Sequence, residues 1–237
     1  MIFALRHPAL LLGLLLGFVL GVALRAEVQR MVSRPGGLFG RRRLAPVGGR
    51  GGRPKLGWAG YIDPFGAVAA VLGGAGWGPR PAPRFGTSSD WLLLVAALLV
   101  HGLLAVIGFA AFVALGGHMV DLNPNFVGMH VSDVLRGQGI VEFFRLNAVQ
   151  LIALGFAVEN VACGLLALVP LPPLELGVAL WSRLPKSPGA RRIAYHVLEE
   201  HWGVGIVLLL ILLPIGGLAP PLLAVIDAVG DAIFRAF

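Results

Sequence analysis

The stretch that decides the fold is WLLLVAALLVHGLLAVIGFAAFVAL, residues 91–115. It contains one ionisable side chain, His101, among about 25 otherwise apolar or small residues. About 20 consecutive apolar residues are enough for a helix to cross the hydrocarbon core of a bilayer, which is about 30 Å thick. The stretch therefore predicts a helix that spans a membrane.

The composition of the whole chain agrees with this prediction. Of its 237 residues, 57% are hydrophobic and 13% are charged, and the mean hydropathy is +0.84. Soluble domains carry about 25% charged residues, so this composition excludes the usual classes of water-soluble enzyme. The single cysteine, Cys163, excludes an intrachain disulfide and a cysteine-rich metal site.

Further apolar runs on both sides of this stretch predict a polytopic, all-α membrane protein. Residues 58–77 are interrupted by Asp63-Pro64 and by two glycines, which predicts a re-entrant or short element that must be buried in protein. We therefore expect residues 1–237 to form one membrane domain. Its other predicted spans are 8–24, 146–169 and 203–218, followed by a C-terminal helix over 219–237.

An Arg- and Gly-rich segment, residues 25–57, separates the first apolar run from the second. Between residues 25 and 55 it holds nine basic residues and one acidic residue, a net charge of +8. Such a segment is typical of the cytoplasmic side of a membrane protein and attracts anionic lipid. Nucleic-acid binding is not favoured, because the segment has no interleaved aromatic residues apart from Phe39 and is rich in glycine.

The charges of the loops also predict the orientation of the chain. The basic residues of 175–201 place this segment on the cytoplasmic side with 25–57, whereas the more acidic loop 118–146 belongs on the other side. Both basic segments share one side only if residues 58–77 do not cross. We expect an integral membrane protein, in the plasma membrane of a bacterium.

Three polar side chains lie well inside predicted spans, away from the span ends: His101, Glu159 and Asn160. Burying such groups in hydrocarbon is costly, so each is a candidate functional residue. The simpler interpretations are that His101 makes a hydrogen bond between helices and that Glu159 caps or pairs within the bundle.

Asn160 and the stretch LVPLPPLELG, residues 168–177, form the most informative motif. With the segments 52–66, 76–83 and 181–185, it resembles the site-2 protease family of intramembrane zinc metalloproteases, and the resemblance covers nearly the whole chain. The resemblance implies a site-2-protease-like bundle. The residues that it places along a substrate cleft are Asp63, His101, Asn160, Pro170, Pro172 and Pro173.

The chemistry of that family requires a His-Glu-x-x-His motif on a helix, which this chain lacks. By spacing, the motif falls on residues 26–30, so the two histidine positions hold Ala26 and Arg30, and Glu27 stands at the position of the general base. The third ligand position falls on Glu175. We expect these metal positions to be empty, and an Arg30–Glu175 ion pair to replace the metal.

The sequence thus predicts a site-2-protease-like protein that has lost catalysis and that binds another membrane protein or a single-pass helix. An active protease with non-standard ligands is the alternative, and it alone would require zinc, with Glu27 as base. A small transporter or channel is a third possibility, although polar residues in the spans are few.

Overall fold

The computed structural model describes residues 1–33, 61–79, 89–117, 130–138, 146–181, 183, 187–198, 202–214 and 219–234. All regular secondary structure in these ranges is helical. The predicted all-α class is therefore confirmed for the described part of the chain.

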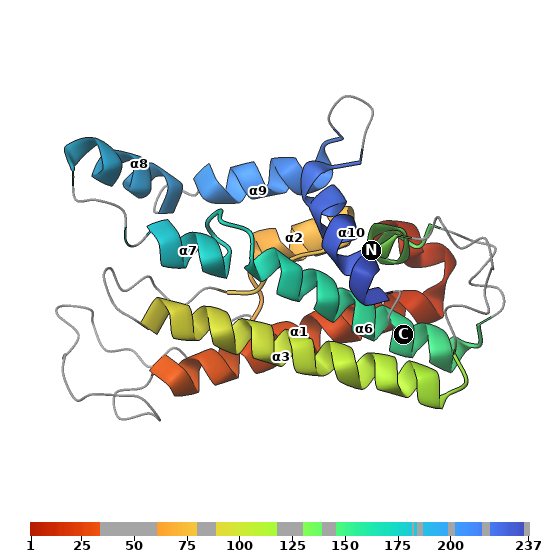
Figure 1. Cartoon of the computed structure of the whole chain (residues 1–237). Coiled ribbons are helices and arrows are strands. Elements are labelled where there is room, and N and C mark those ends of the chain that lie inside the picture. The colour runs from red at the N-terminus through yellow and green to blue at the C-terminus, as the bar shows by residue number, and fades with distance from the viewer. Residues whose placement is uncertain are drawn as a thin grey trace.

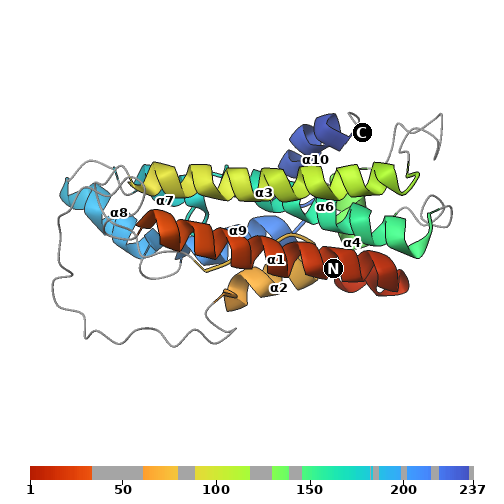
Figure 2. The same cartoon turned by 90° about the horizontal axis from the view of Figure 1, so that it is seen from below.

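Three long helices form the body of the molecule: α1 (Pro8–Ser33), α3 (Ser89–Ala114) and α6 (Ala148–Ala167). They pack side by side, as Figures 1 and 2 show, and each is long and apolar enough to cross a membrane. α3 and α6 closely match the predicted spans 91–115 and 146–169. The first predicted boundary is corrected, because α1 continues without a break past residue 24 to Ser33.

The segment between α1 and α3 returns to the end of the bundle from which it started. In Figure 1, α1 ends and α3 begins at the same end of the bundle. The helix between them, α2 (Pro64–Gly73), has 10 residues and is therefore about 15 Å long, half of the hydrocarbon core. Asp63 caps its N-terminus, and Gly74, with a φ of 98°, ends it in the left-handed conformation that glycine favours. This geometry supports the re-entrant interpretation of 58–77, of which residues 58–60 lie outside the described part.

The remaining helices are short and pack around the three long ones (Figure 1). α9 (Trp202–Leu212) has 11 residues, about 16 Å, so it is too short to be the span that we predicted over 203–218; residues 215–218 of that prediction are not described. The other short helices are η1 (Ile2–Arg6), α4 (Val131–Arg136), α7 (Glu175–Trp181), α8 (Pro188–Leu198) and α10 (Pro221–Phe234).

Glycines spaced four residues apart allow α1 to lie directly against α6. A Cβ atom on Gly13 would lie 2.3 Å from the carbonyl oxygen of Ile152, and one on Gly17 would lie 2.9 Å from that of Phe156. One turn later, a Cβ on Gly21 would lie 2.7 Å from the side-chain oxygen of Asn160. Small residues at this spacing are a common means of close helix packing in membranes. We call Gly13, Gly17 and Gly21 the glycine seam.

Two carboxylates of α10 hold the N-terminus of α4. Asp227 accepts hydrogen bonds from the backbone N–H of Ser132 (2.8 Å) and its hydroxyl (2.7 Å), and Asp231 pairs with Nδ1 of His130 (2.6 Å). The hydrogen bond to Asp231 raises the pKa of His130, whereas burial raises the pKa of Asp227. Asp227 and Asp231 therefore join α10 to the N-terminus of α4.

Candidate functional site

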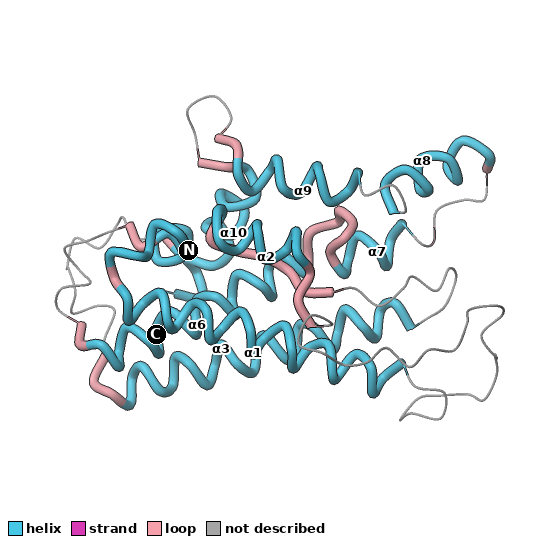
Figure 3. Tube along the Cα trace, turned by 180° about the vertical axis from the view of Figure 1, so that it is seen from behind, coloured by secondary structure: helices cyan, strands magenta, loops and turns pink. Residues whose placement is uncertain are grey.

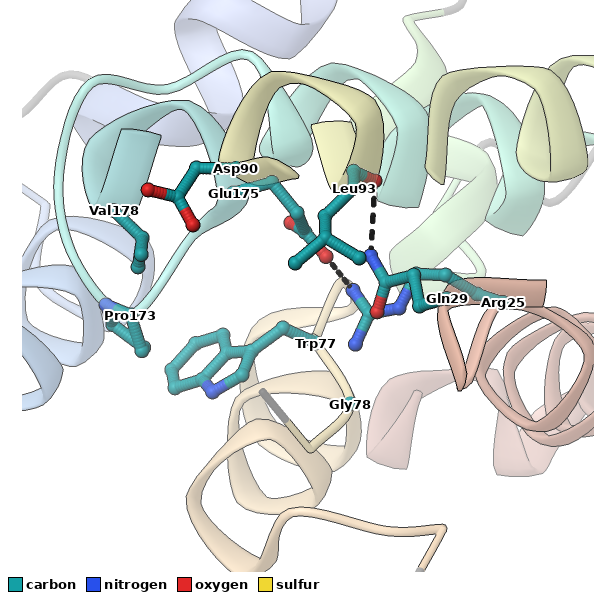
Figure 4. A pocket seen from close by; sticks show the side chains of 9 residues that line it. All are labelled: Arg25, Gln29, Trp77, Gly78, Asp90, Leu93, Pro173, Glu175 and Val178. Carbon is teal, nitrogen blue, oxygen red and sulfur yellow. Dashed lines mark hydrogen bonds and ion pairs between the residues drawn. The ribbon is translucent and has the colours of Figure 1, made fainter. Parts of the chain in front are cut away.

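A small pocket lies where α1 and α7 meet two non-helical segments, residues 74–79 and 168–174. Both segments pass through the middle of the molecule between helices (Figure 3). The cavity has a volume of about 20 Å³, which is enough for about one water molecule. Its lining, drawn in Figure 4, consists of Arg25, Gln29, Trp77, Gly78, Asp90, Leu93, Pro173, Glu175 and Val178.

Arg25 of α1 forms an ion pair with Glu175 of α7 inside this pocket (Figure 4). Its side chain is 4% exposed and that of Glu175 is 11% exposed. The guanidinium group also donates a hydrogen bond to the carbonyl oxygen of Pro79 at 3.2 Å. Because a charge is costly to bury unless it is paired, Arg25 and Glu175 depend on each other. The pair links two segments that are 150 residues apart in the sequence.

The face of α1 that lines the pocket differs by one residue from the predicted one. Arg25 and Gln29, spaced i, i+4, both line the pocket together with Glu175, and Gln29 Nε2 donates a hydrogen bond to the carbonyl oxygen of Leu93 at 3.0 Å. The predicted positions, Ala26 and Arg30, each follow by one residue and are absent from the lining.

Arg30 and Glu27 pair with each other rather than with Glu175. Arg30 lies 2.7 Å from a carboxylate oxygen of Glu27 and 4.6 Å from the centre of the Tyr61 ring, and the Tyr61 hydroxyl donates a hydrogen bond to the same oxygen of Glu27. About one third of each charged side chain is exposed. The predicted Arg30–Glu175 pair is therefore corrected to Arg25–Glu175, and Glu27 is held outside the pocket.

The residues of this pocket do not fit a zinc ion. Zinc in a catalytic site needs three protein ligands, usually His, Cys or carboxylate. Ala26 has no ligand atom, Arg25 and Arg30 are cations, and Glu175 is already bound by Arg25. Among the described residues, the group that could bring three ligand atoms together is His130, Asp227 and Asp231. It lies on α10 and the N-terminus of α4, and its hydrogen bonds are those that join these two helices.

His101 and Asn160 meet in a different place, at the junction of the three long helices. Nδ1 of His101 lies 3.0 Å from the side-chain oxygen of Asn160, and both residues are buried. The amide nitrogen of Asn160 donates to the carbonyl oxygens of Phe156 (2.9 Å) and Gly17 (3.4 Å). This polar junction thus joins α3, α6 and α1, and His101 makes the interhelical hydrogen bond that the sequence predicted.

The other candidates for the cleft lie in several places. Pro173 lines the pocket, while the carbonyl oxygen of Pro170 accepts a hydrogen bond from the Trp181 ring at 3.3 Å. The carbonyl of Pro172 lies against Gly203 at the start of α9. The carboxylate of Asp63 accepts hydrogen bonds from the backbone of α2 at 2.9 and 3.0 Å, so it serves as a cap.

Glu159 lies fully buried in α6. One of its carboxylate oxygens lies 3.6 Å from the sulfur of Cys163, one turn further along the helix. This contact within α6 agrees with the simpler interpretation, in which the carboxyl group pairs inside the bundle.

Of the nine residues that line the pocket, the sequence predicted Pro173 and Glu175 as site residues; Arg25, Gln29 and Trp77 are among those that it missed. Arg25 had been assigned to the basic loop because it is the first of nine basic residues. The signal that could have found it is the helical repeat of Arg25 and Gln29 with the buried Val22, which places all three on one face of α1. Trp77 is the last residue of the interrupted segment 58–77, and no periodicity of the sequence predicts the path of that segment.

Comparison with protein-family models, with curated proteins and with solved structures gives no match for this chain. The resemblance to site-2 proteases therefore stays a prediction that rests on the quoted motifs.

Proposed function

We propose that this protein is a site-2-protease-like membrane protein without zinc or proteolytic activity, and that it binds or assembles with another membrane protein. The observation that carries the proposal is the Arg25–Glu175 ion pair. It joins Arg25, which directly precedes the residues 26–30 that the resemblance assigns to the ligand helix, to Glu175, which the resemblance assigns to the third ligand position. A guanidinium group there repels a metal cation and occupies the carboxylate that would bind it.

The arrangement around the ion pair supports a shared scaffold. Several residues of the segments on which the resemblance rests line one pocket: Gln29 of residues 26–30, Trp77 of the segment 76–83, and Pro173 and Glu175 of the Pro-rich motif. A cavity of about 20 Å³ is too small for a peptide segment. The meeting of these segments supports the proposed scaffold, and a centre that is filled by side chains suits a binding role.

Zinc content of the purified protein tests the proposal. We expect much less than one zinc per chain, and no cleavage of membrane helices, in detergent and after reconstitution. Near-stoichiometric zinc that is lost in Glu175→Ala would overturn the proposal and would favour an active protease with unusual ligands.

A pair of double variants tests the geometry behind it. The structure places residues 25 and 29 beside Glu175, so Arg25→His with Gln29→His should raise zinc occupancy. Ala26→His with Arg30→His, the matched control, adds the same two imidazoles one residue later and should raise it far less. Equal occupancy in both double variants would contradict the assigned face of α1.

A further inference from the structure

A second cavity opens between α3 and α6. It shares no lining residue with the pocket that contains Arg25. Its volume is about 270 Å³, and Ile233 of α10 borders it. Ten of its twelve lining residues are apolar or glycine; the polar ones are His101 and Asn160. We call this cavity the α3–α6 groove. Its full lining is Leu98, His101, Gly102, Ala105, Val106, Phe109, Asn160, Val161, Gly164, Leu165, Leu168 and Ile233.

The hydrogen bonds around Asn160 determine what the groove offers to an occupant. Both hydrogen bonds of its amide nitrogen go to backbone carbonyls, of Gly17 and Phe156, so the amide oxygen is the atom that faces His101. An amide oxygen only accepts, so Nδ1 of His101 carries the hydrogen. A neutral imidazole with a hydrogen on Nδ1 has a bare Nε2, which is an acceptor. The occupant must therefore supply a donor.

The depth of His101 selects the class of molecule that can supply this donor. His101 lies near the middle of the candidate span Asp90–Ala114, about 15 Å from either edge of the hydrocarbon core. Lipid hydroxyl and amine groups are held at the headgroup level and do not reach this depth. The side chain of a membrane-spanning helix does, and serine and threonine hydroxyls make hydrogen bonds of this kind between helices.

The surface of α3 at the groove is shaped for the approach of a helix. Gly102 lines the groove, and a Cβ atom built on it would have no atom within 4 Å. Its neighbours Leu99 and Leu103 are 68% and 61% exposed. A glycine notch between leucines lets a second helix backbone come close, as at other small-residue contacts in membranes.

We infer that the α3–α6 groove binds a membrane-spanning helix of another protein, which donates a hydrogen bond from a serine or threonine hydroxyl to His101. The inference rests on the proposed function, because it identifies the surface that holds the partner. A second copy of this chain does not fit, since residues 8–32, 90–114 and 148–167 contain neither serine nor threonine.

Synthetic polyleucine helices provide a direct test. The full chain is reconstituted in phosphatidylcholine vesicles with a labelled peptide that has one central serine, or with the same peptide that has alanine there, and association is measured by energy transfer. We expect the serine peptide to bind about three- to tenfold more tightly, the range for one hydrogen bond between membrane helices. Equal binding of the two peptides overturns the inference and leaves the groove to lipid chains.

Two variants separate the hydrogen bond from the notch. His101→Leu should abolish the preference for serine, so that the serine and alanine peptides bind with equal affinity. Gly102→Leu should weaken the binding of both peptides. The control is Gly205→Leu on α9, where a Cβ atom also has no atom within 4 Å; this variant should bind both peptides as the unmodified protein does. If the serine peptide still binds Gly102→Leu at full affinity, the binding site lies elsewhere.

The zinc content of these variants is measured in parallel. Failure of peptide binding in a zinc-free protein contradicts the inference about the groove alone, whereas stoichiometric zinc contradicts the proposed function.

Discussion

Arg25 and Glu175 form a buried ion pair, so removing one charge leaves the other without its partner. If Arg25 is changed to alanine, the carboxylate of Glu175 stays in a site where 11% of its side chain is exposed and loses its cation. Leaving one charge of a buried pair unpaired costs about 3–5 kcal/mol. We therefore predict that Arg25→Ala lowers the free energy of unfolding in detergent by an amount in this range.

The Arg30–Glu27 pair is the matched control for this prediction. Its two side chains are 34% and 37% exposed, so Arg30→Ala should cost no more than about 1 kcal/mol. The double variant Arg25→Met with Glu175→Leu removes both buried charges and should recover most of the stability lost in Arg25→Ala. Equal losses in Arg25→Ala and Arg30→Ala would show that the buried pair does not form in the membrane protein.

The sequence predicted which residue types are present or missing at this site better than it predicted which side chains face each other. The absence of histidines at residues 26 and 30 was visible directly, and Glu175 was identified from the Pro-rich motif. The identity of its cation was not, because Arg25 and Arg30 are separated by less than two helical turns, and the rotation of α1 about its axis decides which one faces inward. That rotation is determined by the packing of the glycine seam against α6, a tertiary contact that local spacing does not reveal.

At the scale of the helices, the glycine seam brings α1 and α6 into direct contact. The carbonyl oxygen of Ile152 lies in the space that a side chain on Gly13 would need. Adding one therefore requires the two helices to separate, and such overpacking costs about 1–3 kcal/mol. We predict that Gly13→Val lowers the unfolding midpoint in a titration with a denaturing detergent.

Gly205→Val provides the comparison for this prediction. It makes the same substitution in an apolar helix, but at a site where nothing lies within 4 Å of the new Cβ atom. Its unfolding midpoint should stay close to that of the unmodified protein. If the two valine variants unfold at the same midpoint, α1 and α6 are not in direct contact at Gly13.

Length and polarity determined which helices the sequence could predict. α3 and α6 were found almost to the residue because a long apolar run between polar segments has no other stable form in a membrane. The length of α9 was overestimated, because the apolar run in the sequence continues to Pro214 and beyond, whereas the helix ends at Leu212. α4 was missed because its six residues carry little periodic signal, and its N-terminus is capped by carboxylates from α10 about 100 residues away.

The whole molecule has two chemically different ends. The end where α1 finishes and α3 begins also carries α8, with its two arginines (Figure 1), and the residues that follow α1 in the sequence are basic. The other end carries the junction of α4 and α10, in which Asp227 and Asp231 take part. A bundle with such an asymmetry has a preferred orientation, because basic loops stay on the cytoplasmic side.

We predict that residues 36–55 and 183–192 face the cytoplasm and that residues 120–140 face the opposite side. Cysteines are introduced one at a time at Met31 and Gly189, and at Leu115 for the other end. The native Cys163 is buried, so a membrane-impermeant maleimide should report the new thiols. We expect Met31→Cys and Gly189→Cys to react in inverted vesicles and Leu115→Cys to react in intact cells. Labelling of positions 31 and 189 from opposite sides would mean that the segment between α1 and α3 crosses the membrane, and it would contradict the re-entrant position of α2.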